Sequence, residues 1–154
     1  MHFEKLVNVI KGQNVITLPK GLKLYHGLRR KEGEDYFTAT HWLTTDLNYA
    51  VDYAFKVDFN NKHLVTRDLL ICETLQELNL VDMSGINMNS LTEMLSKDHN
   101  IDMNDRWVKD LFVINANYAL DIEIHGYAKN FNSECDEILI GYVDNVLKII
   151  KIID

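Results

Sequence analysis

The chain is poor in residues that restrict or cross-link a backbone, with one proline and two cysteines among 154 residues. Two cysteines cannot form the disulfide framework of a small secreted protein, and we expect both thiols to be reduced. No apolar run approaches the roughly 20 residues of a membrane-spanning helix. The N-terminus lacks the basic patch and long apolar stretch of a signal peptide. These absences predict an intracellular, cytoplasmic protein with no membrane partner.

The sequence also lacks the spacings that mark metal and nucleotide sites. Its six histidines show no HxxxH pattern and its cysteines form no CxxC pair, so we predict no metal. The absence of GxGxxG and of GxxxxGKS/T excludes the Rossmann and P-loop classes. A net charge of -7 argues against a non-specific nucleic-acid binder, because neutralising phosphates requires a basic surface.

Neither cysteine is placed for nucleophilic chemistry. Cys72 lies within an apolar strand pattern and is predicted to be structural. Cys135 lies beside acidic residues, which raise the pKa of a thiol and so reduce the share of reactive thiolate. A cysteine nucleophile is therefore disfavoured.

What the chain does have is the composition of an ordinary globular protein, with 47% hydrophobic and 25% charged residues. Its length predicts a single domain over residues 1–154. Strands are predicted at 22–28, 69–74, 78–83, 120–128, 137–143 and 147–153, with strand-forming aromatic and threonine residues at 36–45. Helices are predicted after Asp46, over 90–95 from a capping-box pattern, and after Asp105. This order favours an α+β fold over a regular βαβ alternation.

Several residues stand out as candidates for a functional site. His26 and Gly27 are adjacent inside a predicted strand, where a glycine allows a ligand to approach the backbone closely. Glu137 is a charged residue that opens a late apolar strand. Tyr49 and Tyr53 fall four residues apart, beside the apolar stripe of the helix predicted after Asp46. These two tyrosines are therefore free to face a cleft.

The order of these elements resembles a known family. Tyr25-His26-Gly27 matches an aromatic-His-Gly strand, and Trp42-Leu43-Thr44-Thr45-Asp46 matches an aromatic strand that leads into a helix. Asp136-Glu137-Ile138-Leu139-Ile140 matches a late strand that carries a glutamate. Together they resemble the ADP-ribosyltransferase superfamily, nearest its diphtheria-toxin/poly(ADP-ribose)-polymerase-like H-Y-E branch. The resemblance extends from Leu22 to Ile153.

The resemblance implies a split fold of two small antiparallel or mixed sheets around a cleft for NAD, with short flanking helices. It implies that Glu137 and His26 are catalytic and that Gly27 binds the nicotinamide carboxamide through its backbone. Tyr53 sits at the spacing of the tyrosine that stacks on nicotinamide. NAD is then a co-substrate that binds through His26, Gly27, Trp42, Thr44, Tyr49 and Tyr53, without a metal.

Three positions differ from the family pattern. Trp42 stands where the middle tyrosine of H-Y-E is expected, and Ala50 replaces the serine that binds the carboxamide, for which Thr44 or Thr45 could substitute. Cys135 stands two residues before Glu137, in place of the Glu or Gln of the toxins.

The function implied by the resemblance is mono-ADP-ribosylation of a protein or nucleic-acid acceptor, with release of nicotinamide. One alternative is a catalytically silent module that binds NAD, ADP-ribose or a protein partner. Another is an enzyme similar to RNA 2′-phosphotransferases, which requires more arginine in the pocket. The sequence determines neither the acceptor nor the oligomeric state.

Overall fold

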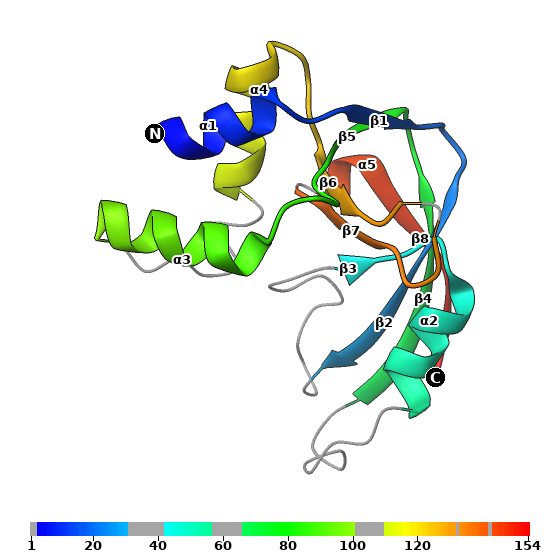
Figure 1. Cartoon of the computed structure of the whole chain (residues 1–154). Helices are drawn as coiled ribbons and strands as arrows, with labels where there is room; N and C mark the ends of the chain where they lie inside the picture. Colours follow the sequence, from blue (N-terminus) through cyan, green and yellow to red (C-terminus); the bar gives the residue numbers. More distant parts are fainter. Residues whose placement is uncertain (1–2, 31–41, 57–65, 101–109, 132, 142) are drawn as a thin grey trace.

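The structure, a computed structural model, describes residues 3–30, 42–56, 66–100, 110–131, 133–141 and 143–154. It contains two small β-sheets with helices around them (Figure 1). The larger sheet has the strand order β1-β5-β6-β7-β3 and the smaller sheet has the order β2-β4-β8. Only β5 and β6 pair in parallel among the strand pairs of the described chain. The predicted α+β class with two small mixed or antiparallel sheets is therefore confirmed.

The bounds of the elements are as follows. The larger sheet consists of β1 (Val15–Leu18), β5 (Leu78–Asp82), β6 (Gly126–Lys129), β7 (Glu137–Ile140) and β3 (Trp42–Leu43). The smaller sheet consists of β2 (Lys23–Arg30), β4 (Thr66–Thr74) and β8 (Leu147–Ile153). The helices are α1 (Glu4–Lys11), α2 (Leu47–Val51), the π-helical turn η1 (Asp52–Lys56), α3 (Met88–His99), α4 (Phe112–Leu120) and α5 (Val143–Val146).

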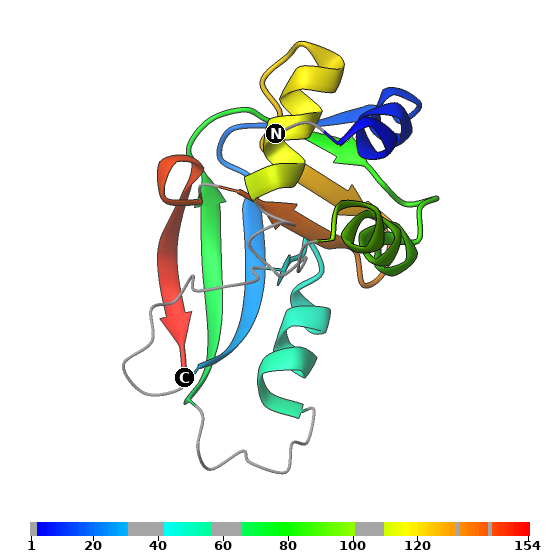
Figure 2. The ribbon, with the colours of Figure 1, turned by 90° about the vertical axis from the view of Figure 1, so that its left-hand side faces the viewer.

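The central strands of the larger sheet, β5, β6 and β7, are buried on both faces, because they alternate apolar side chains between two cores. In β7, Leu139 joins a cluster that also contains residues of α1, α3 and α4, including Leu6, Leu95 and Phe112. Ile138 and Ile140 point the opposite way, into a cluster shared with β2 and β4 of the smaller sheet. Figure 2 shows the three helices on one side of the larger sheet and the three-stranded sheet beside it.

A short backbone connection joins the two sheets where β2 meets the end of β3. The N–H of Tyr25 donates to the carbonyl of Thr44 at 2.8 Å, and the N–H of Thr44 donates to the carbonyl of Tyr25 at 2.9 Å. Since β3 also pairs with β7, this bridge brings the His-Gly strand close to the strand that begins with Glu137.

Several local predictions need correction. The helix predicted over 90–95 is present but longer: α3 runs from Met88 to His99, and its N-cap is Asn87, which accepts from the N–H of Ser90 at 3.0 Å. The run 120–128 is not one strand, because α4 ends at Leu120 and β6 begins only at Gly126. The strand predicted over 137–143 ends at Ile140, and Val143 begins α5. Helix α1 and strand β1 were not predicted. Residues 36–41 and the predicted cap Asp105 lie outside the described residues.

Both thiols are free, as expected. Burial raises the pKa of Cys72 to about 12. Desolvation raises the pKa of Cys135 too, and the charges of Asp46 and Glu134 add to that rise. No helix in the described part of the chain is long and apolar enough to cross a membrane. Within the same ranges, no three His, Cys, Asp or Glu side chains are grouped so as to hold a metal ion.

Candidate active site

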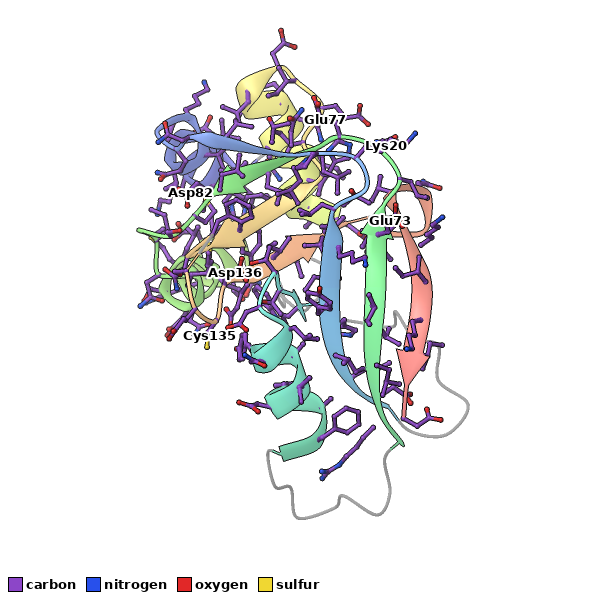
Figure 3. The ribbon with its side chains drawn as sticks, turned by 90° about the vertical axis from the view of Figure 1, so that its right-hand side faces the viewer. Lys20, Glu73, Glu77, Asp82, Cys135 and Asp136 are labelled. Atoms are coloured by element: carbon purple, nitrogen blue, oxygen red, sulfur yellow. The ribbon has the colours of Figure 1, made fainter. Side chains whose placement is uncertain are left out.

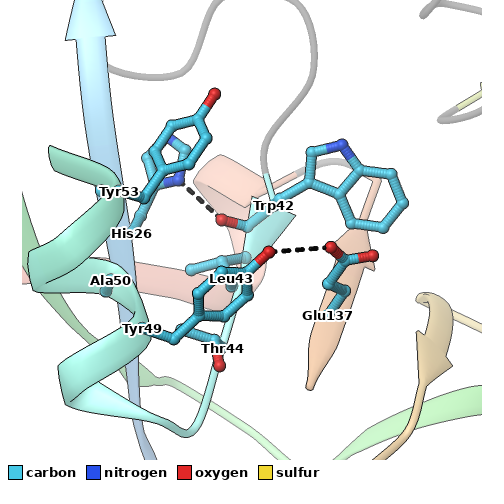
Figure 4. A pocket seen from close by; sticks show the side chains of 9 residues that line it. His26, Trp42, Leu43, Thr44, Tyr49, Ala50, Tyr53 and Glu137 are labelled. Atoms are coloured by element: carbon cyan, nitrogen blue, oxygen red, sulfur yellow. Dashed lines mark hydrogen bonds between the residues drawn. The ribbon is translucent and has the colours of Figure 1, made fainter. Parts of the chain in front are cut away.

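A pocket of about 110 Å³ lies where β2, β3, β7 and the helix α2–η1 meet (Figure 4). The described residues that line it are His26, Gly27, Trp42, Leu43, Thr44, Tyr49, Ala50, Tyr53 and Glu137. All of the residues that the sequence marked as catalytic or NAD-binding are among them. The fold thus brings residues between 26 and 53 together with Glu137 near the other end of the chain.

His26 on β2 is held in one orientation by a hydrogen bond to the backbone of β3. Its side chain is only 5% exposed, and its Nδ1–H donates to the backbone carbonyl of Trp42 at 2.7 Å. Burial lowers the pKa of the imidazole, and the hydrogen bond to Trp42 opposes this only partly. His26 is therefore neutral near pH 7, with its proton on Nδ1, and its Nε2 carries a lone pair that accepts hydrogen bonds.

Gly27 is required first by the packing of the helix against β2. A Cβ at this position would lie 2.4 Å from the carbonyl oxygen of Ala50 and 3.0 Å from the backbone nitrogen of Ala54. This position therefore needs a glycine for a structural reason that applies without any ligand, beside the close ligand approach expected from the sequence. The backbone N–H and C=O of Gly27 point to the same side of β2 as those of Tyr25, two residues earlier. That side is toward β3 and the pocket.

Glu137 is the first residue of β7, and its side chain meets that of Tyr49 on α2. The hydroxyl of Tyr49 donates to Oε1 of Glu137 at 3.0 Å (Figure 4). Burial raises the pKa of Tyr49 to about 12, and the hydrogen bond and the charge of Glu137 contribute to that rise. Tyr49 thus stays protonated at neutral pH. It engages one carboxylate oxygen and leaves Oε2 for other partners.

Two aromatic rings stand at the pocket. Figure 4 shows Tyr53 and Trp42 on opposite sides, with Tyr49 and Glu137 below them. Tyr53 is 48% exposed and Trp42 is 36% exposed. Trp42 meets the ring of Tyr127 edge to face, with centroids 5.9 Å apart and an interplanar angle of 79°. The indole is therefore braced on one side, while both rings keep surface available for stacking.

Asp136 organises the turn between β3 and α2, a role that the sequence analysis missed. It is fully buried and accepts from the hydroxyl of Thr44 at 2.5 Å, from the hydroxyl of Thr45 at 2.6 Å and from the N–H of Thr45 at 2.9 Å. Figure 3 shows it next to the start of α2. The sequence pattern could have indicated this buried role, because strand alternation places Asp136 on the same face as the apolar residues Ile138 and Ile140.

The hydrogen bonds of the same turn engage the hydroxyl of Thr44. Its hydroxyl donates to Asp136 and also accepts from the N–H of Asp46 at 3.0 Å. Asp46 in turn caps α2 by accepting from the N–H of Tyr49 at 3.2 Å. Thr44 lines the pocket, but its hydroxyl proton serves the turn. The idea that Thr44 or Thr45 supplies the missing serine hydroxyl is therefore not supported by this geometry.

The pocket combines a single carboxylate, a neutral imidazole, strand backbone and two aromatic faces among its described lining residues. Such a set suits a planar ring that carries or develops positive charge. Searches against profiles of known protein families, curated protein sequences and solved structures found no match.

Proposed function

We propose that this protein is a mono-ADP-ribosyltransferase that cleaves NAD at the nicotinamide–ribose bond and transfers ADP-ribose to a macromolecule. The observation that carries the proposal is the convergence of Glu137, His26, Gly27, Trp42 and Tyr53 on one pocket. The resemblance to the H-Y-E branch of ADP-ribosyltransferases names the same residues. The split arrangement of two small sheets supports it further.

The aromatic residues and Gly27 are proposed to bind the nicotinamide ring. A cationic ring between Tyr53 and Trp42 gains about 0.5–2 kcal/mol from the π-faces. The N–H and C=O of Gly27 offer one donor and one acceptor, the complement of a carboxamide. Ala50 supplies no hydroxyl here, so carboxamide binding rests on the backbone of Gly27.

Glu137 is proposed to stabilise the positive charge that develops on C1′ as the glycosidic bond breaks. The electron pair of that bond leaves with nicotinamide, and a nearby carboxylate favours the resulting oxocarbenium-like state. The hydrogen bond from Tyr49 orients the carboxylate. The Oε2 atom of Glu137 can accept a hydrogen bond from a ribose hydroxyl or the proton of the incoming nucleophile. His26 is proposed to fix Trp42 at the pocket through the hydrogen bond from its Nδ1–H to the carbonyl of Trp42.

The second candidate is a module that binds NAD without cleaving it. Ala50 at the serine position and the engaged hydroxyl of Thr44 favour this alternative. The RNA 2′-phosphotransferase alternative is weaker, because the described lining of the pocket contains no arginine to hold a 2′-phosphate.

The test is Glu137→Gln, which keeps the size of the side chain and removes its charge. Incubation with labelled NAD should show nicotinamide release reduced by about 10²–10³, while NAD affinity changes far less, since the charge interaction strengthens only in the transition state. Glu134→Gln, at an exposed neighbouring position, is the matched control and should retain activity. An active wild type with an equally active Glu137→Gln variant would contradict the assignment. A wild type that binds NAD and releases no nicotinamide would establish the silent module.

A further inference from the structure

A second hollow adjoins the small pocket. Its volume is about 830 Å³, against about 110 Å³ for the pocket. The two share Trp42, Tyr53 and Glu137. From there the hollow, called here the outer groove, continues to the segment Ser84–Asn89, to Thr92 on α3, and to Tyr127 and Lys129 on β6. Glu137 therefore borders both spaces.

The reaction proposed above needs two spaces at one carboxylate. The small pocket has room for a single ring, the leaving nicotinamide. The nucleophile has to reach C1′ from outside that pocket while its proton remains within reach of Glu137. The outer groove satisfies both conditions, because it is the larger space and Glu137 forms part of its wall.

The lining of the outer groove restricts the acceptor. Among its described residues Lys129 is the one cation and Glu137 the one anion. Lys129 pairs with Glu137 in the register of β6 and β7, so the two side chains emerge on the same face. An ammonium beside the carboxylate disfavours a guanidinium or amine acceptor, and a single cation is too little for a polynucleotide.

The remaining polar groups of the outer groove are neutral. The hydroxyl of Ser84 is bonded to Asp82 and Asn130, and Oδ1 of Asn87 caps α3. The amide of Asn89 and the hydroxyl of Thr92 are therefore the relevant groups. Side-chain amides and hydroxyls offer both donors and acceptors, which match the backbone of an extended peptide. A neutral hydroxyl is also the type of nucleophile that needs a base, and Glu137 supplies one.

We propose that the outer groove is the acceptor site and that it binds a polypeptide segment presenting a serine or threonine hydroxyl; this rests on the proposed transferase function. The hydroxyl oxygen forms a bond to C1′ as the bond from C1′ to nicotinamide breaks. The electron pair of the broken bond leaves on nicotinamide, and the hydroxyl proton passes to Oε2 of Glu137 and then to water.

The test uses three peptide libraries that are random except for one central residue, which is Ser, Arg or Ala, together with a random single-stranded oligonucleotide. Labelled NAD provides two readouts: release of nicotinamide and transfer of label. The matched variants are Asn89→Arg, which fills the outer groove, and Asn48→Arg. Asn48 lies in another hollow, lined by Asp46, Asp52 and Glu134, that shares Tyr49 with the small pocket and no residue with the outer groove. Its acidic lining would suit a guanidinium acceptor.

We expect label on the serine library above the arginine and alanine libraries. Asn89→Arg should reduce this transfer by about tenfold or more, the scale of one or two lost hydrogen bonds, while nicotinamide release to water is retained. Asn48→Arg should leave transfer intact. Preference for the arginine library or the oligonucleotide, loss of transfer in Asn48→Arg alone, or nicotinamide release without label on serine peptides would each overturn the proposal. Absence of nicotinamide release would instead remove the proposed function itself.

Discussion

At the scale of single residues, the contact between Tyr49 and Glu137 connects two positions that are 88 residues apart in the chain. The tyrosine hydroxyl holds one carboxylate oxygen, and its raised pKa keeps the donor protonated across the neutral range. We therefore expect Tyr49 to position Glu137, in addition to its predicted place among the NAD-binding residues.

Replacement of Tyr49 by Phe tests this role. The variant keeps the ring and loses the donor, so we expect nicotinamide release to fall by about ten- to a hundredfold, the value of one hydrogen bond to a charged group. The effect should appear in kcat rather than KM, and the free energy of unfolding should change by less than about 1 kcal/mol. Tyr118→Phe, at an exposed position on α4, is the control. An unchanged kcat in Tyr49→Phe would rule out the positioning role.

His26 predicts a dependence of stability on pH. Its pKa is lowered in the folded state, so below pH about 6.5 the unfolded chain takes up a proton that the folded protein refuses. This contribution is present above pH 6.5 and is lost as the pH falls toward the folded pKa, by at most about 1.4 kcal/mol per pH unit. Urea unfolding between pH 7.5 and 5 should show a shallower loss of stability in His26→Gln than in the wild type. Parallel curves would contradict the buried neutral imidazole.

At the scale of elements, the site depends on how closely the helix α2–η1 packs against β2. Gly27 permits the contact with the carbonyl of Ala50, while Asp46 and Asp136 fasten the start of the helix to β3 and β7. The position of Tyr49 and Tyr53 over the pocket follows from this packing, since both residues lie on that helix.

Gly27→Ala should push the helix away from the strand. We expect a loss of about 1–3 kcal/mol in the free energy of unfolding, typical of overpacking, and a weaker NAD response, because the tyrosines move with the helix. The matched control is Gly12→Ala, where the nearest atom would lie 3.6 Å from the new Cβ, an ordinary contact. Chemical denaturation of both variants measures the difference. Equal free energies of unfolding for Gly27→Ala and the wild type would contradict this prediction, because the helix would then accommodate the methyl group without loss of stability.

At the scale of the whole molecule, the pocket is assembled from both sheets and the helix that lies between them, so a ligand there should stabilise the fold. At a hundredfold excess over its Kd, a ligand that binds only the folded state adds about 2.7 kcal/mol. For a chain of this size that corresponds to a Tm increase of roughly 5–10 °C. Thermal unfolding with millimolar NAD measures it, and Tyr53→Ala should reduce the shift. No shift for the wild type would exclude NAD binding at these concentrations.

Local sequence patterns were sufficient for the α+β class, for the strand that carries His26 and Gly27, and for Asp46 as the cap of α2. Each depends on residues within about one turn or one strand, where side-chain alternation and capping act directly. The family resemblance added the set of residues that lines the pocket. The start of α3 was misplaced because the sequence offers two candidate N-caps three residues apart, Asn87 and Ser90, and Asn87 is the one that caps the helix.

The tasks of these residues were decided only by the tertiary structure. The hydroxyl of Thr44 is engaged by Asp136, 92 positions away, and Gly27 is required by the carbonyl of Ala50 on a neighbouring helix. Such contacts arise when separate elements pack, and no local period in the sequence records them. The sequence by itself therefore determined which residue types are available to the site, whereas packing between distant segments decided which of them face the pocket and which hold it together.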